Sequence, residues 1–486
     1  MKYKAQKHEP LFFIPIHLRR SAFFLWLFSL ILALISLLGQ SLKLWTHFDN
    51  AFGLVPLFNI SARQSVQSII SVLLLFNLMF FLIVMSRIKD TEMDRFRRQW
   101  ASLPFFALYL ALHKGTGVHN LIIDPLVDQL VILFPQIHIT RFYVTVTLSA
   151  IIFLGFFSRL YFSLPKRTKR LLLAAGFLFI AGLRKLGIDL KMLDGINFLI
   201  AETISRWLEM SGTVLLLYAF VDYLRISQIT VIFRVDGATQ KHSTDSGDKL
   251  KSKAAQDITL LPRRVVKILT SISLSLWLVS LAAQFLRYSA GHENALGLIP
   301  IMDVGRESSI PTMFSVQLLY LAATVLGCIS VFKHEAKDSF RREWTLLSFG
   351  FLFMSLDEGS SIHELLTMPV WNRLGAGASG FFRFAWVIPA GALVALIGLL
   401  LLKFLITLDK RTRNLFVLSG LIFLSGSIGM EMIGGNYALT QGLWNLPYSL
   451  LAAAEELLEM AGATLFVYAL LDFLRRYYPE FSLKFE

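Results

Sequence analysis

The sequence has a single cysteine, Cys328, among its 486 residues. One thiol excludes an internal disulfide and leaves the redox compartment unassigned. Charged residues are also scarce, at 16% of the chain, whereas apolar residues make up 55% and include 42 Phe. Soluble domains carry roughly 25% charged residues. The long uncharged runs therefore predict an all-α protein, a polytopic transmembrane helical bundle.

Familiar enzyme motifs are absent as well. The chain has no HExxH pair, no GxSxG turn and no Walker loop. The Glu-x-x-His spacing of ferritin-like bundles is also missing, so a di-iron carboxylate bundle is not supported. No motif names a reaction, and the chemistry must be read from the placement of ionisable residues.

Acidic residues are outnumbered, with 33 Asp and Glu against 47 Lys and Arg, which gives a net charge of +14. Membrane topology alone requires basic cytoplasmic loops, so this excess does not indicate nucleic acid. Lys and Arg gather in the N-terminus, the C-terminus and alternate loops. These parts are predicted to be cytoplasmic, in an integral protein of the bacterial inner membrane. The apolar run Phe23–Leu38 is long enough to span and is expected to be retained rather than cleaved. Membrane lipids are the expected partners, and protein partners are unknown.

An internal repeat is the most specific signal in the chain. GLVP at 53–56, FRRQW at 96–100 and KRTKRL at 166–171 match GLIP at 297–300, FRREW at 340–344 and KRTRNL at 410–415, all at one offset of 244 residues. The segments 208–225 and 458–475 match at an offset of 250. Collinear matches indicate duplication of one unit. We therefore predict a first repeat at 1–225, a largely disordered cytoplasmic linker at 226–263 with a strand-like ITVIFRV, and a second repeat at 264–486.

Each repeat contains six apolar segments of lengths compatible with spanning a membrane. They are predicted at 21–42, 66–86, 99–113, 142–163, 171–187 and 196–224, then at 265–286, 311–332, 343–357, 381–406, 414–432 and 446–474. An even number per repeat predicts two parallel six-helix repeats and about 12 spans. This plan resembles that of major-facilitator transporters, although their glycine-containing loop motif is missing.

The stretch SLDEGSSIHE, at 355–364, ends an apolar segment with several carboxylates. Helix rise places Asp357 about 22 Å from the cytoplasmic interface, inside a hydrocarbon core about 30 Å thick. The same reasoning brings Glu431, Glu455 and Glu459 to one level in the outer leaflet. The stretch Gly359–Ser361 is predicted to break its helix inside the membrane.

Ionised carboxylates at this depth are unfavourable by several kcal/mol unless they are paired, protonated or bound to a cation. A divalent metal ion, with zinc, manganese, iron and calcium as the alternatives, would neutralise them. A free carboxylate would then act as general base toward a metal-bound water. The predicted metal ligands are Asp357, Glu358, His363, Glu455 and Glu459, and the predicted bases are Glu364 and Glu431.

The first repeat lacks this acidic set. It has His113, Lys114, His119 and Asn120 at the positions of Asp357, Glu358, His363 and Glu364, Gly187 in place of Glu431, and Ser205, Arg206 and Glu209 in place of Glu455, Glu456 and Glu459. Lys114 and Arg206 supply positive charge that can pair with Glu209. The asymmetry predicts one working site, in the second repeat.

Structural interpretations compete for several acids. Glu307 is expected at a helix start that Ser308 or Ser309 caps, with Pro311 in the first turn. Glu431 precedes GGN and could end its helix. Glu456 is expected to face away from Glu455.

Three functional hypotheses follow. The first is a metal-dependent membrane hydrolase or transferase that acts on a lipid or lipid-linked substrate from the outer leaflet. The second is a proton- or cation-coupled secondary transporter in which the carboxylates bind the coupling ion. The third is a structural subunit of a membrane assembly. The sequence does not identify a substrate.

Overall fold

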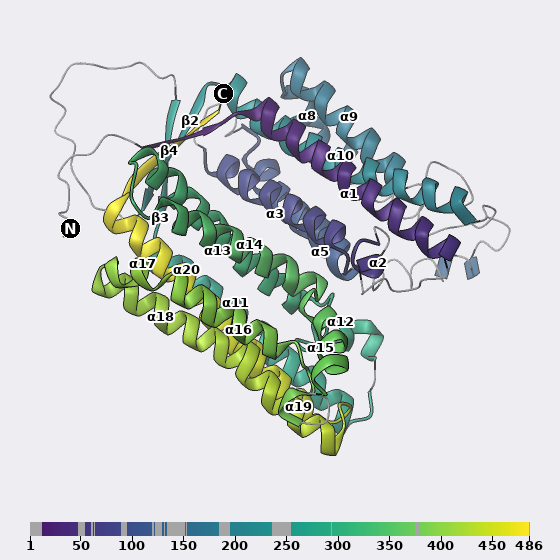
Figure 1. Cartoon of the computed structure of the whole chain (residues 1–486). Helices are drawn as coiled ribbons and strands as arrows, with labels where there is room; N and C mark the ends of the chain where they lie inside the picture. The colour runs from purple at the N-terminus through teal and green to yellow at the C-terminus, as the bar shows by residue number, and fades with distance from the viewer. Residues whose placement is uncertain are drawn as a thin grey trace. The chain divides into compact units, whose positions relative to one another are not determined.

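A computed structural model describes residues 12–46, 54–59, 62, 64–88, 95–118, 121, 129–130, 132–133, 151, 153–183, 195–235, 254–292, 294–375 and 380–485. Helices dominate these residues (Figure 1). Seven of the described helices are long and apolar enough to cross a membrane. The predicted multi-pass helical architecture is confirmed at this level.

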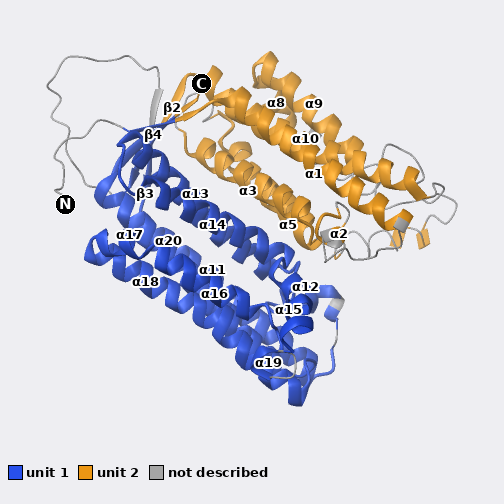
Figure 2. Ribbon diagram, in the orientation of Figure 1, with its two compact units in different colours: residues 1–14, 232–250, 257–483 blue, residues 15–231, 251–256, 484–486 orange. Residues whose placement is uncertain are grey.

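The chain forms two compact units (Figure 2). Unit 2 comprises residues 15–231, 251–256 and 484–486. Within it α1 and α9 each pack along α10, and α3 packs along α5. Its helices are α1 (Leu18–Thr46), α2 (Leu54–Leu57), α3 (Val66–Arg87), α5 (Arg97–Thr116), the π-helical η2 (Phe153–Phe157), α8 (Ser158–Ser163), α9 (Lys166–Leu183) and α10 (Gly195–Ile226).

Unit 1 comprises residues 1–14, 232–250 and 257–483. Here α13 packs along α14, and α11, α13 and α18 all pack against α20. Its long helices are α11 (Pro262–Ser289), α13 (Ile310–Glu335), α14 (Arg341–Ser360), α16 (Val387–Leu400), α18 (Lys410–Leu424), α19 (Glu431–Gln441) and α20 (Leu446–Tyr477). Its short elements are η5 (Ala295–Gly297), α12 (Leu298–Met302), η6 (His363–Leu366), α15 (Thr367–Leu374), η8 (Gly380–Phe382), α17 (Leu402–Thr407) and the π-helical η9 (Ser425–Met430).

The described helices coincide with the predicted apolar segments. Of the segment predicted at 142–163, residues 142–150 and 152 lie outside the described residues, and η2 with α8 occupies 153–163. The alternative prediction that a helix ends at Glu431 is wrong, because the helix continues from Lys410 to Gln441 through the π-helical turn η9. The extra residue of a π turn rotates the side chains that follow it, so Glu431 faces a neighbouring helix.

A small β-sheet departs from the all-α prediction. Strands β1 (Phe12–Ile16), β2 (Ile229–Val235), β3 (Ala254–Leu260) and β4 (Glu480–Phe485) form one sheet in the order β1-β4-β2-β3. The strand predicted at ITVIFRV is confirmed as β2, in which alternate residues are buried. Phe233 of β2 stacks on Phe481 of β4, with ring centroids 5.3 Å apart. The predicted disordered linker is therefore ordered at both ends, while residues 236–253 lie outside the described residues.

Each unit anchors its last long helix by the same kind of aromatic contact. In unit 2, Trp100 is buried and stacks on Tyr223 of α10, with centroids 5.7 Å apart. In unit 1, Trp344 is buried and packs on Phe473 of α20, with centroids 4.9 Å apart. These residues occupy corresponding positions in the matched sequence segments.

Each unit also contains the same ion pair to a buried aspartate. Arg167 of α9 pairs with Asp222 of α10 at 2.9 Å, and Arg411 of α18 pairs with Asp472 of α20 at 2.9 Å. Both aspartates are almost fully buried. Buried carboxylates need such partners, so these pairs hold neighbouring helices in register.

Candidate functional site

The helix α14 breaks where the sequence predicted. It ends at Ser360, and Ser361 has a left-handed backbone with φ 50°. The chain then turns back, so that the backbone N–H of His363 donates to Asp357 Oδ1 at 2.7 Å. The imidazole Nδ1 lies 3.0 Å from Asp357 Oδ2. Both carboxylate oxygens of Asp357 are therefore engaged by one residue.

The Asp357–His363 pair affects the charge of the imidazole. Burial lowers the pKa of His363, but the hydrogen bond and negative charge of Asp357 outweigh that effect and raise the pKa to about 9. His363 lies in η6, beyond the end of α14. At neutral pH the two residues form an ion pair.

Trp386, which sequence reasoning missed, connects this pair to the next acid. Its ring lies 4.3 Å from the imidazole of His363, centroid to centroid. Its indole Nε1–H donates to Glu431 Oε1 at 3.1 Å. Trp386 precedes α16, and no acidic motif surrounds it in the sequence. Only the fold brings it to the site.

Glu431 and Glu455 form a carboxyl pair. Their side chains lie within hydrogen-bonding reach of each other between α19 and α20. Ionised carboxylates only accept hydrogen bonds, so a bond between these two groups would require a proton on one of them. Tyr448 lies within electrostatic range of Glu431, Glu455 and Arg383. Tyr448 was not among the predicted site residues, although its spacing of seven residues places it on the same face of α20 as Glu455.

Glu358 and Glu459 line a narrow cavity that is too small to hold a water molecule. The other lining residues are Ser315, Leu318, Leu319, Phe423, Met460 and Ala463. Ser315 is 4% exposed, and its Oγ has no hydrogen-bond partner among the described residues. A buried, unpartnered hydroxyl beside two carboxyl groups is an unfavourable arrangement in apolar surroundings. A proton on either carboxyl group would give this hydroxyl a neutral partner.

Two further acids join the cluster. Glu456 follows Glu455 on α20 and lies within electrostatic range of Glu358, Glu307 and Glu431, so it belongs to the acidic cluster. The predicted helix start is confirmed, because Ser309 Oγ accepts from the Thr312 N–H at 3.2 Å at the start of α13. Burial raises the pKa of Glu307, which precedes this cap, and nearby carboxylates raise it further.

The acids therefore gather, but as pairs rather than as a coordination shell. Among the described residues, no group of three or more His, Cys, Asp or Glu side chains is arranged to hold a metal ion. Asp357 is engaged by His363, Glu455 by Glu431, and Glu358 shares its cavity with Glu459. Glu364, one of the two predicted bases, is exposed.

Unit 2 neutralises its corresponding acid. Lys114 Nζ lies 2.8 Å from Glu209 Oε1, and Arg206 pairs with both Glu209 at 3.3 Å and Glu202 at 3.2 Å. The pairing predicted for Lys114, Arg206 and Glu209 is confirmed. The positions of His119, Asn120 and Gly187 lie outside the described residues. Two cations thus compensate one carboxylate cluster in unit 2, whereas carboxyl groups contact one another in unit 1.

The fold and the site define a class, that of multi-pass helical membrane proteins with clustered carboxyl groups. Residues 270–474 are similar to a family model described as "Domain of unknown function (DUF8692)". This range begins within α11 and ends within α20, so it includes every acid of the cluster. No curated protein and no solved structure matches the chain.

Proposed function

We propose that this protein is a proton-coupled secondary transporter that binds protons on the carboxyl groups of its second half. The observation that carries the proposal is the close approach of the Glu431 and Glu455 carboxyl groups among further buried acids. Two carboxyl groups in contact, with their neighbours also acidic, are stable at membrane depth when they hold protons. Proton release and uptake at such groups is how transporters and pumps couple transport to a proton gradient.

A twelve-span plan of two parallel six-helix repeats belongs to this proposal. The matched sequence segments support it. So do the contacts that recur in both units, made by Trp100 in one and Trp344 in the other, and by Asp222 in one and Asp472 in the other. Parallel repeats can rock about a shared site and expose it to alternate sides. The positive-inside count supports a bacterial inner-membrane location with both termini in the cytoplasm and the cluster toward the exterior.

Infrared spectroscopy of purified, reconstituted protein tests proton binding directly. A protonated carboxyl group has a C=O band that an ionised carboxylate lacks. We expect this band at neutral pH, and we expect Glu455→Gln to remove a large part of it. Glu335→Gln, at the exposed end of α13, is the matched control and should leave the band unchanged. A wild-type protein without the band would overturn the proposal.

Transport itself is tested in proteoliposomes with a trapped pH-sensitive dye. Candidate solutes are added against an imposed proton gradient. We expect at least one solute to accelerate collapse of the gradient in wild-type vesicles and in Glu335→Gln vesicles. Glu455→Gln vesicles should respond about as slowly as empty ones.

A second candidate function is hydrolysis or group transfer on a lipid or lipid-linked substrate, and the Asp357–His363 pair favours it. A carboxylate that orients an imidazole is an arrangement for general acid–base catalysis. With a pKa of about 9 the imidazole of His363 is protonated on both nitrogens at neutral pH, so its Nε2–H, which no described residue bonds, would donate a proton to a leaving group. This enzyme would bind a divalent metal ion if the acids rearranged around it.

Elemental analysis separates the candidates, with wild type compared to Glu455→Gln/Glu459→Gln. Stoichiometric zinc, manganese, iron or calcium that is lost in the variant would favour the enzyme or a structural subunit with a fixed ion. Absence of metal together with the infrared band supports the transporter.

A further inference from the structure

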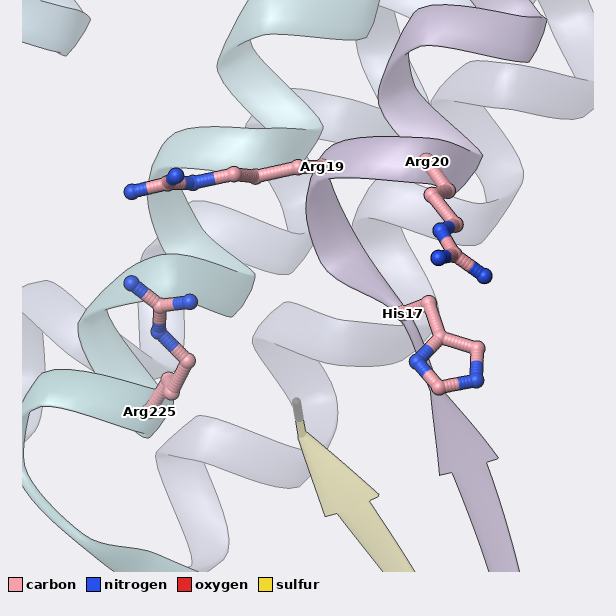
Figure 3. Close-up of a pocket in the computed structure, with 4 residues that line it drawn as sticks. All are labelled: His17, Arg19, Arg20 and Arg225. Atoms are coloured by element: carbon pink, nitrogen blue, oxygen red, sulfur yellow. The ribbon is translucent and has the colours of Figure 1, made fainter.

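A basic pocket lies in unit 2, far along the chain from the acidic cluster. His17, Arg19, Arg20 and Arg225 line a cavity of about 300 Å³ at the start of α1 and the end of α10 (Figure 3). These two helices pack along each other. In Figure 3 the guanidinium of Arg225 lies below that of Arg19, and the ring of His17 lies below Arg20. Every side chain that lines the cavity can carry positive charge.

The nearest acid does not neutralise this pocket. Asp222 pairs with Arg225 at 3.2 Å and with Arg167 at 2.9 Å, so one carboxylate is shared between two guanidinium groups. Arg19 and Arg20 form no ion pair with any described residue. The pocket therefore carries an excess of positive charge.

The position of the arginines adds to this excess. Arg19 and Arg20 lie in the first turn of α1, which contains no acidic residue. A helix N-terminus carries partial positive charge and unsatisfied N–H groups, so cations there are unfavourable and anions are favoured. In Figure 3 Arg19 extends toward Arg225 and Arg20 extends toward His17, on opposite sides of α1. Arg side chains beside a helix N-terminus are a recurring feature of phosphate sites.

Topology alone explains the basic residues in the first turn of α1 but not the histidine beside them. The corresponding residues of the other unit are Leu261, Arg263, Arg264 and Arg475. Arg263 and Arg264 occupy the first turns of α11 and meet the same need for cytoplasmic positive charge. Leu261, however, replaces the imidazole of His17. The histidine is thus particular to unit 2.

We propose that this pocket binds a phosphate group, and that the phosphate belongs to an anionic phospholipid of the cytoplasmic leaflet. The surface of α1 supports the lipid source. Phe23 and Phe24, one turn beyond the arginines, are 56% and 63% exposed. A headgroup phosphate bound at the start of α1 would place its acyl chains beside these rings. The site is separate from the carboxyl cluster, and its test does not depend on the proposed transport.

Native mass spectrometry of the full-length protein in neutral detergent tests the proposal. The probes are phosphatidylglycerol and phosphatidylcholine with identical acyl chains. Each surface cation contributes about 1 kcal/mol to binding of anionic lipid. Arg19→Gln/Arg20→Gln should therefore weaken retention of phosphatidylglycerol about 30-fold, which is the fold-change for two such contributions. The matched control, Arg263→Gln/Arg264→Gln, removes the same charge and should retain the lipid.

A second arm distinguishes the two sources of phosphate. If millimolar inorganic phosphate displaces phosphatidylglycerol from wild type, the pocket is a phosphate site that a soluble phosphate can also occupy. If it does not, the acyl chains contribute and the lipid source is supported. Arg19→Lys/Arg20→Lys keeps the charge and should bind within about tenfold of wild type. Equal loss in the control, or no preference for phosphatidylglycerol over phosphatidylcholine in wild type, would overturn the proposal. Unchanged elution in gel filtration verifies that each variant is folded.

Discussion

Single residues at the acidic cluster combine packing with proton chemistry, and Trp386 is the clearest case. Its ring packs on His363 while its N–H donates to Glu431. Glu431 therefore receives one neutral donor and, in the proposed function, shares a proton with Glu455. The indole fixes which oxygen of Glu431 remains free for that proton.

Trp386→Phe separates the two roles, because it keeps an aromatic ring but removes the donor. Loss of one hydrogen bond to a buried acceptor is unfavourable by roughly 1 to 3 kcal/mol. We expect a lower melting temperature in detergent and a shift in the infrared carboxyl band. Trp371→Phe, which removes an indole bond to a backbone carbonyl at 3.3 Å, is the control and should leave the band unchanged. An unchanged band in Trp386→Phe would contradict the role given to this donor.

Asp409 gives a pH-dependent prediction away from the spans. Partial burial raises the pKa of Asp409, but hydrogen bonds from Arg476 and Thr412 outweigh it and lower the pKa below its ordinary value. A lowered pKa in the folded state stabilises the protein above the ordinary pKa of Asp, and this stability is lost as pH falls through the lowered value. Asp409 also caps α18 by accepting from the Arg411 and Thr412 N–H groups.

We expect Asp409→Asn to lower unfolding free energy by about 1 to 2 kcal/mol at neutral pH, since it removes a charge while keeping an oxygen cap. The difference from wild type should shrink below about pH 4, where the unfolded aspartate takes up a proton. Thermal unfolding in detergent at pH 3.5, 5 and 7 measures it. A difference that stays constant over this range would disprove the ionic contribution.

At the scale of elements, the π-helical turn η9 brings two helices into close contact at the cluster. A Cβ added at Gly426 would lie 2.8 Å from the backbone oxygen of Glu455 and 2.9 Å from Cγ of Glu459. Only glycine permits this approach. The acids of α20 are thus positioned by a residue that carries no side chain.

Gly426→Ala should therefore separate η9 from α20. Overpacking of this kind typically destabilises by about 1 to 3 kcal/mol, and we expect the infrared carboxyl band to change with it. Gly420→Ala, on α18, is the matched control because a Cβ there meets nothing within 4 Å. It should be neutral or slightly stabilising, as alanine is the better helix former. Equal effects of the two substitutions would show that packing at Gly426 is unimportant.

At the scale of the whole molecule, hydropathy predicted helices well because each span is a local, continuous apolar run. The break after Ser360 was also local, and it was predicted from Gly359–Ser361. The four-stranded sheet was predicted only at β2, because its strands pair across the length of the chain. Such pairing leaves little trace in any one segment.

The candidate site divides in the same way. Helix rise placed the acids at one depth, and the cluster of Glu431, Glu455 and Glu459 agrees with that placement. The pairs within the cluster depend on the π turn and on the turn at Ser361. After such turns, residue spacing alone does not predict where the side chains point. Trp386 and Tyr448 entered the site through packing of separate helices, so a search for acidic motifs could not find them.

The predicted topology has its own test. In a Cys328→Ser background the chain has no thiol, so single cysteines report sidedness without interference. Ser243→Cys should react with an impermeant thiol reagent only from the cytoplasmic side. Asn372→Cys, on the exposed part of α15, should react only from the exterior. Labelling of both from one side would contradict the proposed orientation.

The buried aspartate of α20 determines how unit 1 can move. Asp472 bonds Arg411 of α18 and both Arg475 and Arg476 of its own helix. Parting the two helices at this end would separate Asp472 from Arg411 and Asp409 from Arg476. At the opposite end, where η9 meets the carboxyl cluster, no comparable ion pair joins the described residues of these helices. If α18 and α20 move apart, they should therefore separate at the carboxyl cluster and stay in contact at Asp472, which would act as the hinge.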